Sequence, residues 1–308
     1  MNLQTTIHSP ISVSGKGLHT GQQVTVTFEP MPANSGIVFL RDDLPGKPTV
    51  KATPLTVFDT SRGTSIKDGD AMVHTIEHLM ASLAGLGIDN VLVRTQGMET
   101  PILDGSSRIY VEMLKEAGIQ ELDERKRVGM VKKEISFSIP EQQVELTIRP
   151  ADHFKMTVNV DYGTKILSAQ TAVLDNLQYF YPEFYNCRTF VFLRELQFLI
   201  AHNLVRGGDL DNAIVFVDEV PEKQVLKQLA EFFQKDNIQV TPDHVLNNTA
   251  LRYPNEPARH KLLDLVGDLY LLGVPLQAEI IANRPGHLAN TSFAKKILES
   301  DDFFVTFL

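Results

Sequence analysis

Two stretches of sequence decide the fold of this 308-residue chain: HTIEHLMASLAGLG at residues 74–87 and HKLLDLVGDLYLLG at residues 260–273. In each stretch, two side chains that can bind a metal stand four residues apart, on one face of the expected helix. Each stretch ends at a glycine and is followed by an apolar run typical of a strand. His78 and Asp264 each lie nine residues before that glycine. The shared pattern predicts two similar halves, each with strands, a helix, a glycine and a strand in that order.

If these two helices face each other, they bring three candidate metal ligands together: His78, His260 and Asp264. Histidine and carboxylate ligands suit zinc. The alternative for His260 and Asp264 is an ordinary surface contact between residues one helical turn apart. Asp268 follows one turn later, where it can orient a catalytic histidine.

Glu77 stands next to His78 and can take a proton from a water that the metal acidifies. An exposed helical glutamate is the plain alternative. The letters HTIEH also match the H-x-x-E-H pattern of inverted zinc peptidases, with His74 and His78 as ligands and Glu77 as the base. The peptidase is the second hypothesis, although the downstream glutamate that it requires cannot be identified. A third is a non-enzymatic protein in which these helices only pack two domains together.

Composition narrows the class of protein. The hydrophobic content of 43% is enough for one large or two medium cores. The net charge of −9 argues against a general nucleic-acid binder, but an anionic small ligand needs only a few local cations. Cys187 is the only cysteine, which excludes a disulfide framework and a cysteine-based zinc site. The N-terminus shows no signal peptide and no stretch of about 18 apolar residues occurs, so we expect a soluble, cytoplasmic protein.

Apolar periodicity predicts a mixed chain of the α+β class. In the first half we expect strands within 11–40 and 49–66, and helices over 71–84, capped by Asp70, and 106–117. In the second half we expect strands near 128–138, 143–149, 154–161, 275–282 and 303–307, and helices near 190–203, 222–236 and 258–272. The charged run at residues 121–127 is the best boundary, although a solvated helix end explains it equally well. It divides the chain into an N-terminal domain, residues 1–124, and a C-terminal domain, residues 125–308.

Three further segments carry candidate functional side chains. His287, in RPGH at residues 284–287, is a candidate general acid in a loop, against the alternative of a solvated histidine. Lys261 can stabilise an oxyanion or contact a phosphate, against the alternative of a solvated lysine. The letters GKGLHTG at residues 15–21 lack the order of a P-loop and indicate a tight turn that can bring His19 near a site.

Nine short motifs follow one another along the chain: GLHTG (17–21), TIEHL (75–79), AGLGIDN (84–90), DGS (104–106), RTF (188–190), GG (207–208), HKLLD (260–264), GD (267–268) and GH (286–287). Taken together, and in this order, they resemble those of the UDP-3-O-acyl-N-acetylglucosamine deacetylase family, zinc enzymes of the committed step of lipid A biosynthesis. The resemblance covers nearly the whole chain, and the motifs are specific as a set although no single one is.

The resemblance implies two similar domains, each a sheet with a layer of helices, packed as a β-α-α-β sandwich. It implies that zinc is bound by the three ligands named above, with water in the fourth position, and that Glu77 is the general base. It also implies that His287, oriented by Asp268, stabilises the transition state and protonates the leaving amine. Thr189, with Lys261 nearby, would hold the oxyanion.

The resemblance also implies where the substrate lies. In the family, an insert in the second domain forms an apolar passage for the acyl chain of the substrate, and it matches the region near 188–217 here. The residues that the resemblance places along this passage are Leu18 and His19 at its mouth, then Phe190, Phe192, Leu196, Gly208, Leu210 and Val215. Arg284 and Lys261 are candidates for contact with the UDP phosphates.

The implied reaction is the deacetylation of UDP-3-O-(3-hydroxyacyl)-N-acetylglucosamine to the corresponding glucosamine and acetate, by a monomer. The chain departs from the family pattern at Gly63, where many members have a cysteine. It also departs at His74, which is not a family ligand and leaves a second, inhibitory metal site open. Some lineages fuse this enzyme to a hydroxyacyl-carrier-protein dehydratase domain. Because the chain stops at Leu308, we expect that second activity to be absent from it.

Overall fold

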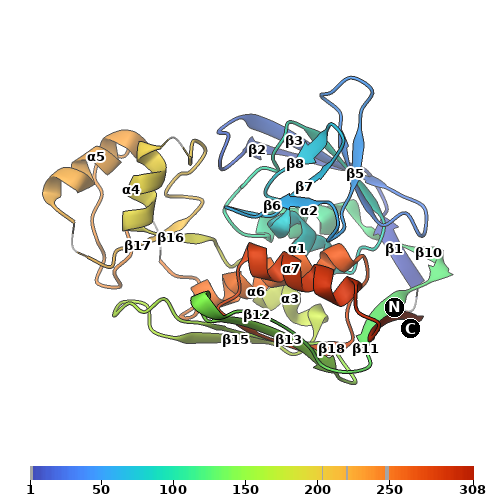
Figure 1. The fold of residues 1–308 in the computed structure, drawn as a ribbon. Helices are drawn as coiled ribbons and strands as arrows, with labels where there is room; N and C mark the ends of the chain where they lie inside the picture. The colour runs from blue at the N-terminus through green and yellow to red at the C-terminus, as the bar shows by residue number, and fades with distance from the viewer. Residues whose placement is uncertain (1–2, 203, 220, 247–249) are drawn as a thin grey trace.

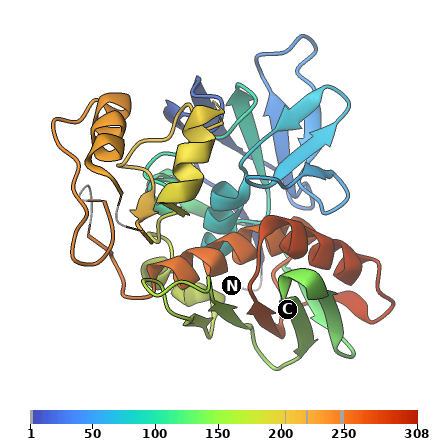
Figure 2. The ribbon, with the colours of Figure 1, turned by 60° about the vertical axis from the view of Figure 1, so that its left-hand side comes forward.

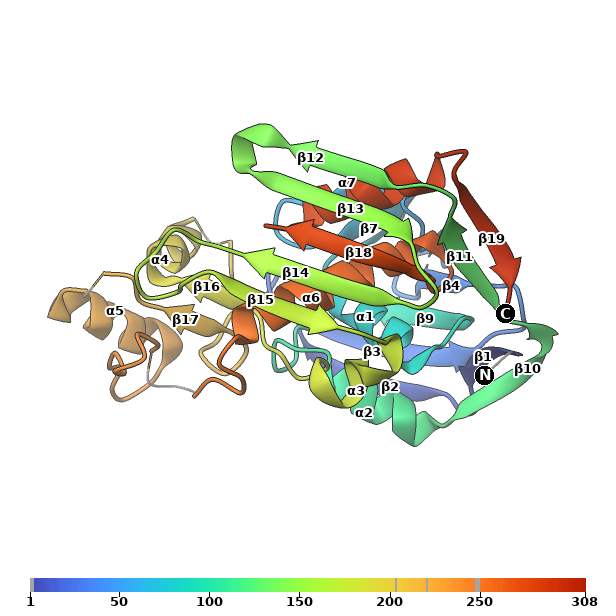
Figure 3. The ribbon, with the colours of Figure 1, turned by 90° about the horizontal axis from the view of Figure 1, so that it is seen from below.

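Two five-stranded sheets enclose the helices of this protein, in the β-α-α-β order expected from the sequence (Figures 1 and 3). The computed structural model describes residues 3–202, 204–219, 221–246 and 250–308. The large core lies between the sheets and includes the inner faces of both sheets and of the helices. The protein is therefore of the α+β class.

The first sheet has the order β2-β3-β9-β4-β5. Its strands are β2 (Ile11–Lys16), β3 (Gln23–Pro30), β9 (Val91–Gln96), β4 (Ile37–Arg41) and β5 (Thr49–Lys51). Burial alternates along β3, where Val24, Val26 and Phe28 point into the core, as the period of a half-buried strand requires. Helices α1 (Glu77–Leu86) and α2 (Arg108–Ala117) belong to this half.

The second sheet has the order β12-β13-β18-β14-β15. Its strands are β12 (Ile135–Ile139), β13 (Val144–Pro150), β18 (Ala278–Asn283), β14 (Lys155–Val160) and β15 (Gln170–Leu174). The pairings repeat those of the first sheet: β4 with β9 and β14 with β18 are parallel, and the others are antiparallel. Because order and direction both repeat, the predicted similarity of the two halves is confirmed.

Helices α6 (Glu256–Leu269) and α7 (His287–Leu298) cover the second sheet, and α6 packs directly on α1. The crossing is close because Gly267 has no side chain: a Cβ there would lie 2.1 Å from the carbonyl oxygen of Glu77. Gly87 and Gly273 end the two helical segments with φ values of 68° and 75°, the left-handed conformation that glycine adopts without cost. The equal spacing of the two motifs therefore reflects two equivalent helix ends.

The chain crosses between the sheets through two consecutive strands, β10 (Ile119–Arg125) and β11 (Arg127–Val131). Each pairs with a strand from one extreme of the chain: β10 with β1 (Leu3–Ile7), and β11 with β19 (Phe303–Phe307). Figure 3 shows these four strands side by side. The charged run expected at a boundary thus lies mostly in β10, and a domain division after residue 124 stays a prediction.

A smaller unit projects from the second half (Figure 2). It contains β16 (Phe190–Phe192), α4 (Leu193–Ala201), β17 (Ile214–Phe216) and α5 (Lys223–Phe233). It has an apolar cluster of its own, to which Leu196, Leu210 and Leu229 belong. The remaining elements are β6 (Val57–Asp59), β7 (Ser65–Asp68), β8 (Ala71–Val73), α3 (Phe180–Glu183) and the short 3₁₀ turns Pro140–Gln142, Leu177–Tyr179 and Tyr270–Leu272.

Several expected elements differ from those observed. The helix predicted over 71–84 begins only at Glu77, because residues 71–73 pair as β8 with β7 and Thr75 has a φ of 59° that no helix accommodates. Asp70 therefore caps no helix. The strand expected near 128–138 is two strands in different sheets, and the helix expected near 190–203 begins after the strand β16. His287, expected in a loop, is the first residue of α7. Within the described residues, no helix is long and apolar enough to cross a membrane.

Candidate metal centre and active site

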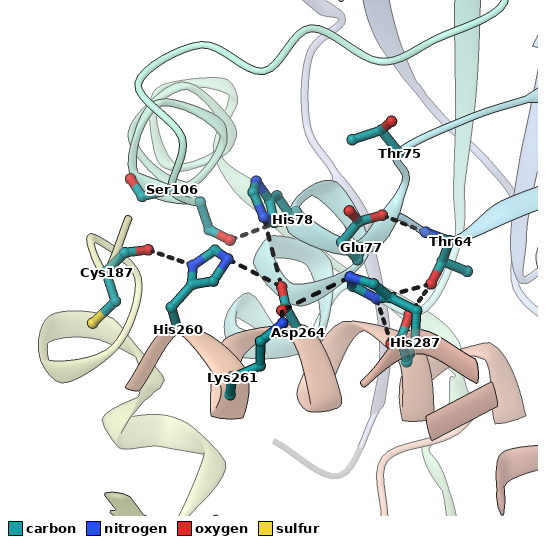
Figure 4. Close-up of polar contacts among 12 residues, drawn as sticks. Thr64, Thr75, Glu77, His78, Ser106, Cys187, His260, Lys261, Asp264 and His287 are labelled. Carbon is teal, nitrogen blue, oxygen red and sulfur yellow. Dashed lines mark hydrogen bonds and ion pairs between the residues drawn. The ribbon is translucent and has the colours of Figure 1, made fainter. Parts of the chain in front are cut away.

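His78, His260 and Asp264 converge where α1 meets α6 (Figure 4). All three side chains are buried, and their candidate ligand atoms lie within 4.8 Å of one another. The Nε2 atoms of His78 and His260 are 3.6 and 3.4 Å from Oδ1 of Asp264. The two helices that the sequence motifs predict to face each other therefore do so through these ligands.

A contact with the backbone fixes the orientation of the His260 ring. Its Nδ1 lies 3.0 Å from the carbonyl oxygen of Cys187, so Nδ1 carries the hydrogen and Nε2 presents its lone pair to the centre of the group. Burial lowers the pKa of His260 to about 3, against the opposing effect of Asp264. The imidazole is therefore neutral at pH 7, which is the form that binds a metal.

Asp264 completes a donor set that fits a divalent cation. Its Oδ1 is buried and accepts no hydrogen bond from the described residues, while its Oδ2 lies 2.9 Å from Nζ of Lys261. Burial opposes ionisation, but His260 and Lys261 together hold the pKa of this carboxyl well below its usual range. A buried carboxylate oxygen without a partner is costly, and a metal held by two neutral imidazoles and this oxygen would satisfy it.

Glu77 begins α1 and is buried beside the ligand His78. The backbone N–H of Thr64 donates to its Oε2 at 2.9 Å. Burial raises the pKa of Glu77, and the nearby His287 and His78 oppose that shift. Glu77 is therefore a stronger base than an exposed glutamate, within reach of whatever occupies the ligand group.

His287 and Asp268 form the other ionisable pair of the site. His287 Nδ1 lies 3.1 Å from Asp268 Oδ2, and its Nε2 lies 3.9 Å from Asp264 Oδ2. Burial and its place at the N-terminus of α7 both disfavour a cation at this histidine. The carboxylate of Asp268 outweighs them and raises the pKa of His287 to about 9. The imidazolium is therefore the main form at neutral pH.

Lys261 and Thr189 lie at the edge of the same site. Burial disfavours the charge of Lys261, yet the adjacent Asp264 keeps its pKa above the usual value. Thr189 is held by backbone hydrogen bonds, from its N–H to Gly105 at 2.7 Å and from the N–H of Ile214 to its carbonyl at 2.8 Å. Both residues line the cavity described next, so each can contact a bound molecule.

A cavity of about 680 Å³ runs from the ligand group into the projecting unit. Its lining includes His78 and His260 at one end and apolar side chains of the projecting unit, such as Leu199 and Phe233, at the other. Six of the substrate contacts expected from the sequence line it: Leu18, His19, Phe190, Leu196, Gly208 and Val215.

Three other expected substrate contacts lie outside the lining of that cavity. Phe192 is buried in a separate cluster with Ile214 and Phe216, and Leu210 packs inside the projecting unit. Arg284 forms an ion pair with Asp161, Nη2 to Oδ2 at 3.2 Å. Packing engages the side chains of Phe192 and Leu210, and an exposed ion pair engages that of Arg284.

The peptidase arrangement of His74 and His78 is wrong. His74 forms an isolated bridge with Glu99, outside the helix, so the four-residue spacing does not align the two imidazoles. Its Nδ1 lies 2.9 Å from Oγ of Ser65, and its ring packs on Phe58. In the part of the chain that the structure describes, the only group of three candidate ligands is the one without His74.

Thr64 and Asn290 belong to the site and were not found by the sequence analysis. The Thr64 hydroxyl donates a very short hydrogen bond to Asp268 and lies 3.3 Å from His287 Nδ1. Asn290 Nδ2 donates to Asp268 at 2.9 Å. Both act across long sequence separations, so no periodicity or spacing signals them. Gly63, where the sequence departs from the family pattern, lies next to Thr64 and faces Glu77, the candidate base. A Cβ on Gly63 would lie 2.9 Å from Glu77 Oε1.

Comparison with known families finds one that covers this site and both sheets. The family described as UDP-3-O-acyl N-acetylglycosamine deacetylase matches residues 4–235 and 229–299. These ranges include every candidate catalytic and metal-binding residue named above.

Similar curated proteins fall into two groups. The bifunctional enzymes LpxC/FabZ of Chlorobaculum tepidum and Porphyromonas gingivalis are 44% and 42% identical to the chain over 302 and 297 residues. The UDP-3-O-acyl-N-acetylglucosamine deacetylase of Chromobacterium violaceum is 37% identical over 306 residues. Those matches cover 97%, 96% and 98% of this chain. The chain spans 65% and 64% of the two bifunctional enzymes, and 92% of the third protein.

Proposed function

This chain belongs to the family of UDP-3-O-acyl N-acetylglycosamine deacetylases, and from that premise we propose that it is a zinc-dependent amide hydrolase. Its substrate is UDP-3-O-(3-hydroxyacyl)-N-acetylglucosamine, and its products are the corresponding glucosamine and acetate, as in the committed step of lipid A biosynthesis. The observation that supports this most is the buried group His78, His260 and Asp264 at the head of an apolar cavity, with Glu77 and His287 beside it.

The donor set favours zinc as the resident metal. Two neutral imidazole nitrogens and one carboxylate oxygen are a common set for a catalytic zinc site, which keeps a further position open. When bound, zinc would supply Lewis acidity, which lowers the pKa of water and polarises an amide carbonyl. His260 is kept in the ligand tautomer by Cys187, and Asp264 has one oxygen free for the ion.

Glu77 acts as the general base. Its raised pKa makes it able to take a proton from the attacking water, while the Thr64 N–H holds Oε2 in place. As the oxygen of that water adds to the acetamide carbon, negative charge develops on the carbonyl oxygen. Lys261 and Thr189 line the cavity and are positioned to stabilise that charge.

His287 acts as the general acid and as a fixed positive charge. Asp268 keeps it protonated, so it can give a proton to the glucosamine nitrogen as the carbon–nitrogen bond breaks. The acetic acid carries the second hydrogen of the attacking water and ionises to acetate in solvent. Glu77 returns its proton to solvent, and His287 is reprotonated from solvent. Each residue is thus ready for the next cycle.

The cavity accounts for the rest of the substrate. Its apolar walls in the projecting unit take the acyl chain, with Leu18 at the mouth and Phe190 and Val215 inside. Lys261 is one of several cations of the lining, and contact with a phosphate of UDP is the alternative to its role at the oxyanion. Arg284 is assigned to an outer contact with a phosphate, which requires it to leave Asp161. A monomeric state and a cytoplasmic location remain predictions from the sequence.

Acetate release tests the proposal. The purified protein is incubated with the acylated nucleotide sugar, and acetate and the free amine are measured before chelation, after chelation and after zinc is restored. We expect about one zinc per chain, loss of activity on chelation and recovery with zinc. A protein that holds zinc and releases no acetate from this substrate would refute the proposed function.

A further inference from the structure

Glu99 is a buried carboxylate that no step of the proposed reaction uses. It is completely enclosed, between β9 and the turn that leads to α2. Its Oε1 accepts hydrogen bonds from the His19 N–H at 3.0 Å and from Thr75 Oγ1 at 3.1 Å. Its Oε2 accepts from the Thr20 N–H at 3.0 Å and from Thr20 Oγ1 at 2.8 Å. All these partners are neutral donors, the surroundings that an enclosed carboxylate acceptor requires.

One side of this network is the mouth of the cavity. Residues 17–21 form a tight turn around Glu99, in which the Gly21 N–H donates to the Gly17 carbonyl at 3.0 Å. A Cβ on Gly17 would lie 2.3 Å from Glu99 Oε2, so this turn can approach the carboxylate only because Gly17 has no side chain. The two residues at its tip, Leu18 and His19, line the cavity.

The turn at residues 17–21, called here the mouth turn, packs against the projecting unit. The Gly207 N–H donates to the Leu18 carbonyl at 3.0 Å, and a Cβ on Gly207 would lie 2.0 Å from the Gly17 carbonyl oxygen. The distance between the turn and the projecting unit is therefore set by backbone contacts. Whatever holds the turn also sets the width of the mouth.

The other side of the network is the start of α1. Thr75 has a φ of 59°, a conformation that costs energy for a β-branched residue, and it precedes Glu77 by two residues. Its side chain bonds to Glu99, and its carbonyl accepts a short hydrogen bond from the Thr100 hydroxyl. Thr75 also lines the cavity, and Figure 4 shows it at the edge of the site. These bonds hold the chain in the conformation from which α1 begins.

We propose that Glu99 is a positioning residue that couples the mouth of the acyl passage to the start of α1, and that selectivity for the acyl chain depends on it. The inference rests on the proposed deacetylase function. The same oxygen, Oε1, accepts from the mouth turn and from Thr75, so a displacement on one side changes the bond on the other. A long acyl chain seated at the mouth thereby favours the arrangement of α1 that presents Glu77 and His78.

The substitution Glu99→Gln tests this with little change of shape. Glutamine puts an N–H₂ group where one carboxylate oxygen accepted two hydrogen bonds, so two donors lose their acceptor. The zinc-loaded full chain is assayed with nucleotide sugars carrying either a long 3-hydroxyacyl chain or a short acyl group. We expect the preference for the long chain, measured as the ratio of kcat/KM values, to fall roughly 10- to 100-fold, the scale of hydrogen bonds to a charged group. An unchanged preference, or equal losses on both substrates, overturns the inference.

Two matched variants separate the sides of the network. Thr20→Val removes a bond only on the mouth side, so the preference falls through KM for the long chain while turnover of the short substrate stays unchanged. Thr75→Val removes only the bond toward α1, so a long chain at the mouth no longer acts on α1 and kcat falls more for the long-chain substrate than for the short one. Equal losses of kcat on the two substrates overturn the coupling. If circular dichroism shows that Glu99→Gln does not fold, Thr20→Val takes its place. An unchanged preference for the long chain in Thr20→Val then refutes the inference. A wild-type protein that deacetylates neither substrate refutes the proposed function itself, whereas an active one with unaltered preference in the variants refutes only this inference.

Discussion

Buried Glu77 and half-buried His287 are the two side chains whose protonation states must differ in the proposed reaction. Burial raises the pKa of Glu77, and Asp268 raises that of His287 to about 9. Both shifts are upward, and the pKa of a histidine begins above that of a glutamate, so the proposed roles require a pH between the two shifted values, where Glu77 is ionised and His287 is protonated. The same buried site thus supports a base and an acid at neutral pH.

Removing the side chain of Glu77 or of His287 should reduce turnover without loss of the bound metal. We expect Glu77→Ala and His287→Ala each to lower kcat by about 10²-fold or more, the usual scale for loss of a general base or acid. His74→Ala is the matched control, since His74 contacts Ser65 and Phe58 away from the ligands. Turnover near that of the wild type in either variant, at normal zinc content, would count against these assignments.

The pH dependence follows from the direction of each shift. Glu77 must be ionised, so kcat/KM falls as pH decreases through its raised pKa; His287 must be protonated, so kcat/KM falls as pH rises through about 9. Asp268→Asn removes the carboxylate that raises the pKa of His287, and the alkaline limb should move to lower pH. The measurement is kcat/KM against pH for both proteins, and an alkaline limb that stays in place would contradict the role of Asp268.

At the scale of elements, the crossing of α1 and α6 sets the geometry of the ligands. In the Gly267→Ala variant, the added methyl group would lie 2.1 Å from the carbonyl oxygen of Glu77. Alanine favours a helix over glycine by about 1 kcal/mol, but overpacking of a rigid backbone contact costs roughly 1–3 kcal/mol or more. We expect lower stability by chemical denaturation together with weaker zinc binding. Gly286→Ala, where a Cβ meets nothing within 4 Å, should change stability little; equal stability of the two variants would refute this view of the crossing.

Elements with a regular apolar period could be predicted from the sequence, and those determined by distant partners could not. Helix α6 was predicted within a few residues because its ligands and apolar side chains follow one helical period. Helix α7 was missed because it follows Pro285 and Gly286, which indicate a turn, and because it buries polar Asn290 and Thr291 against the site. The first residues of the predicted helix near 71–84 have helical period too, yet pairing with β7 makes three of them a strand.

The candidate site, too, could be predicted from the sequence only where its residues follow a regular spacing. The four-residue spacing of His260 and Asp264 indicates two of the candidate ligands, because it places both side chains on one helix face. The same spacing of His74 and His78 is misleading, because His74 lies outside the helix; His78 is indicated instead by its place nine residues before a glycine. Thr64 and Asn290 reach Asp268 from segments with no spacing in common, so only the folded chain reveals them. The resemblance assigns apolar Phe192 and Leu210 to the passage, but both pack in hydrophobic clusters beside the cavity, since apolar side chains fill cores as readily as cavities.

At the scale of the whole molecule, the ligand group joins the two sheets, since His78 comes from one half and His260 and Asp264 from the other. If the proposed zinc binds this group only in the folded chain, it stabilises both halves together. At free zinc 100 times the dissociation constant, the gain is about 2.7 kcal/mol. We expect zinc to raise the melting temperature of the metal-free protein, and Asp264→Ala to abolish that rise. An equal rise in the variant would place the stabilising zinc elsewhere.

The pairing of β10 with β1 and of β11 with β19 has a consequence for the order in which the protein is made. As the chain leaves the ribosome, β1 and β10 belong to the first 125 residues and can pair early. Strand β11 follows at once, but its partner β19 emerges only with residues 303–307. His78 is likewise made well before its partners, so the candidate metal site cannot form until His260 and Asp264 have been synthesised. Metal capture and closure of the β11–β19 pair therefore both wait for the second half of the molecule.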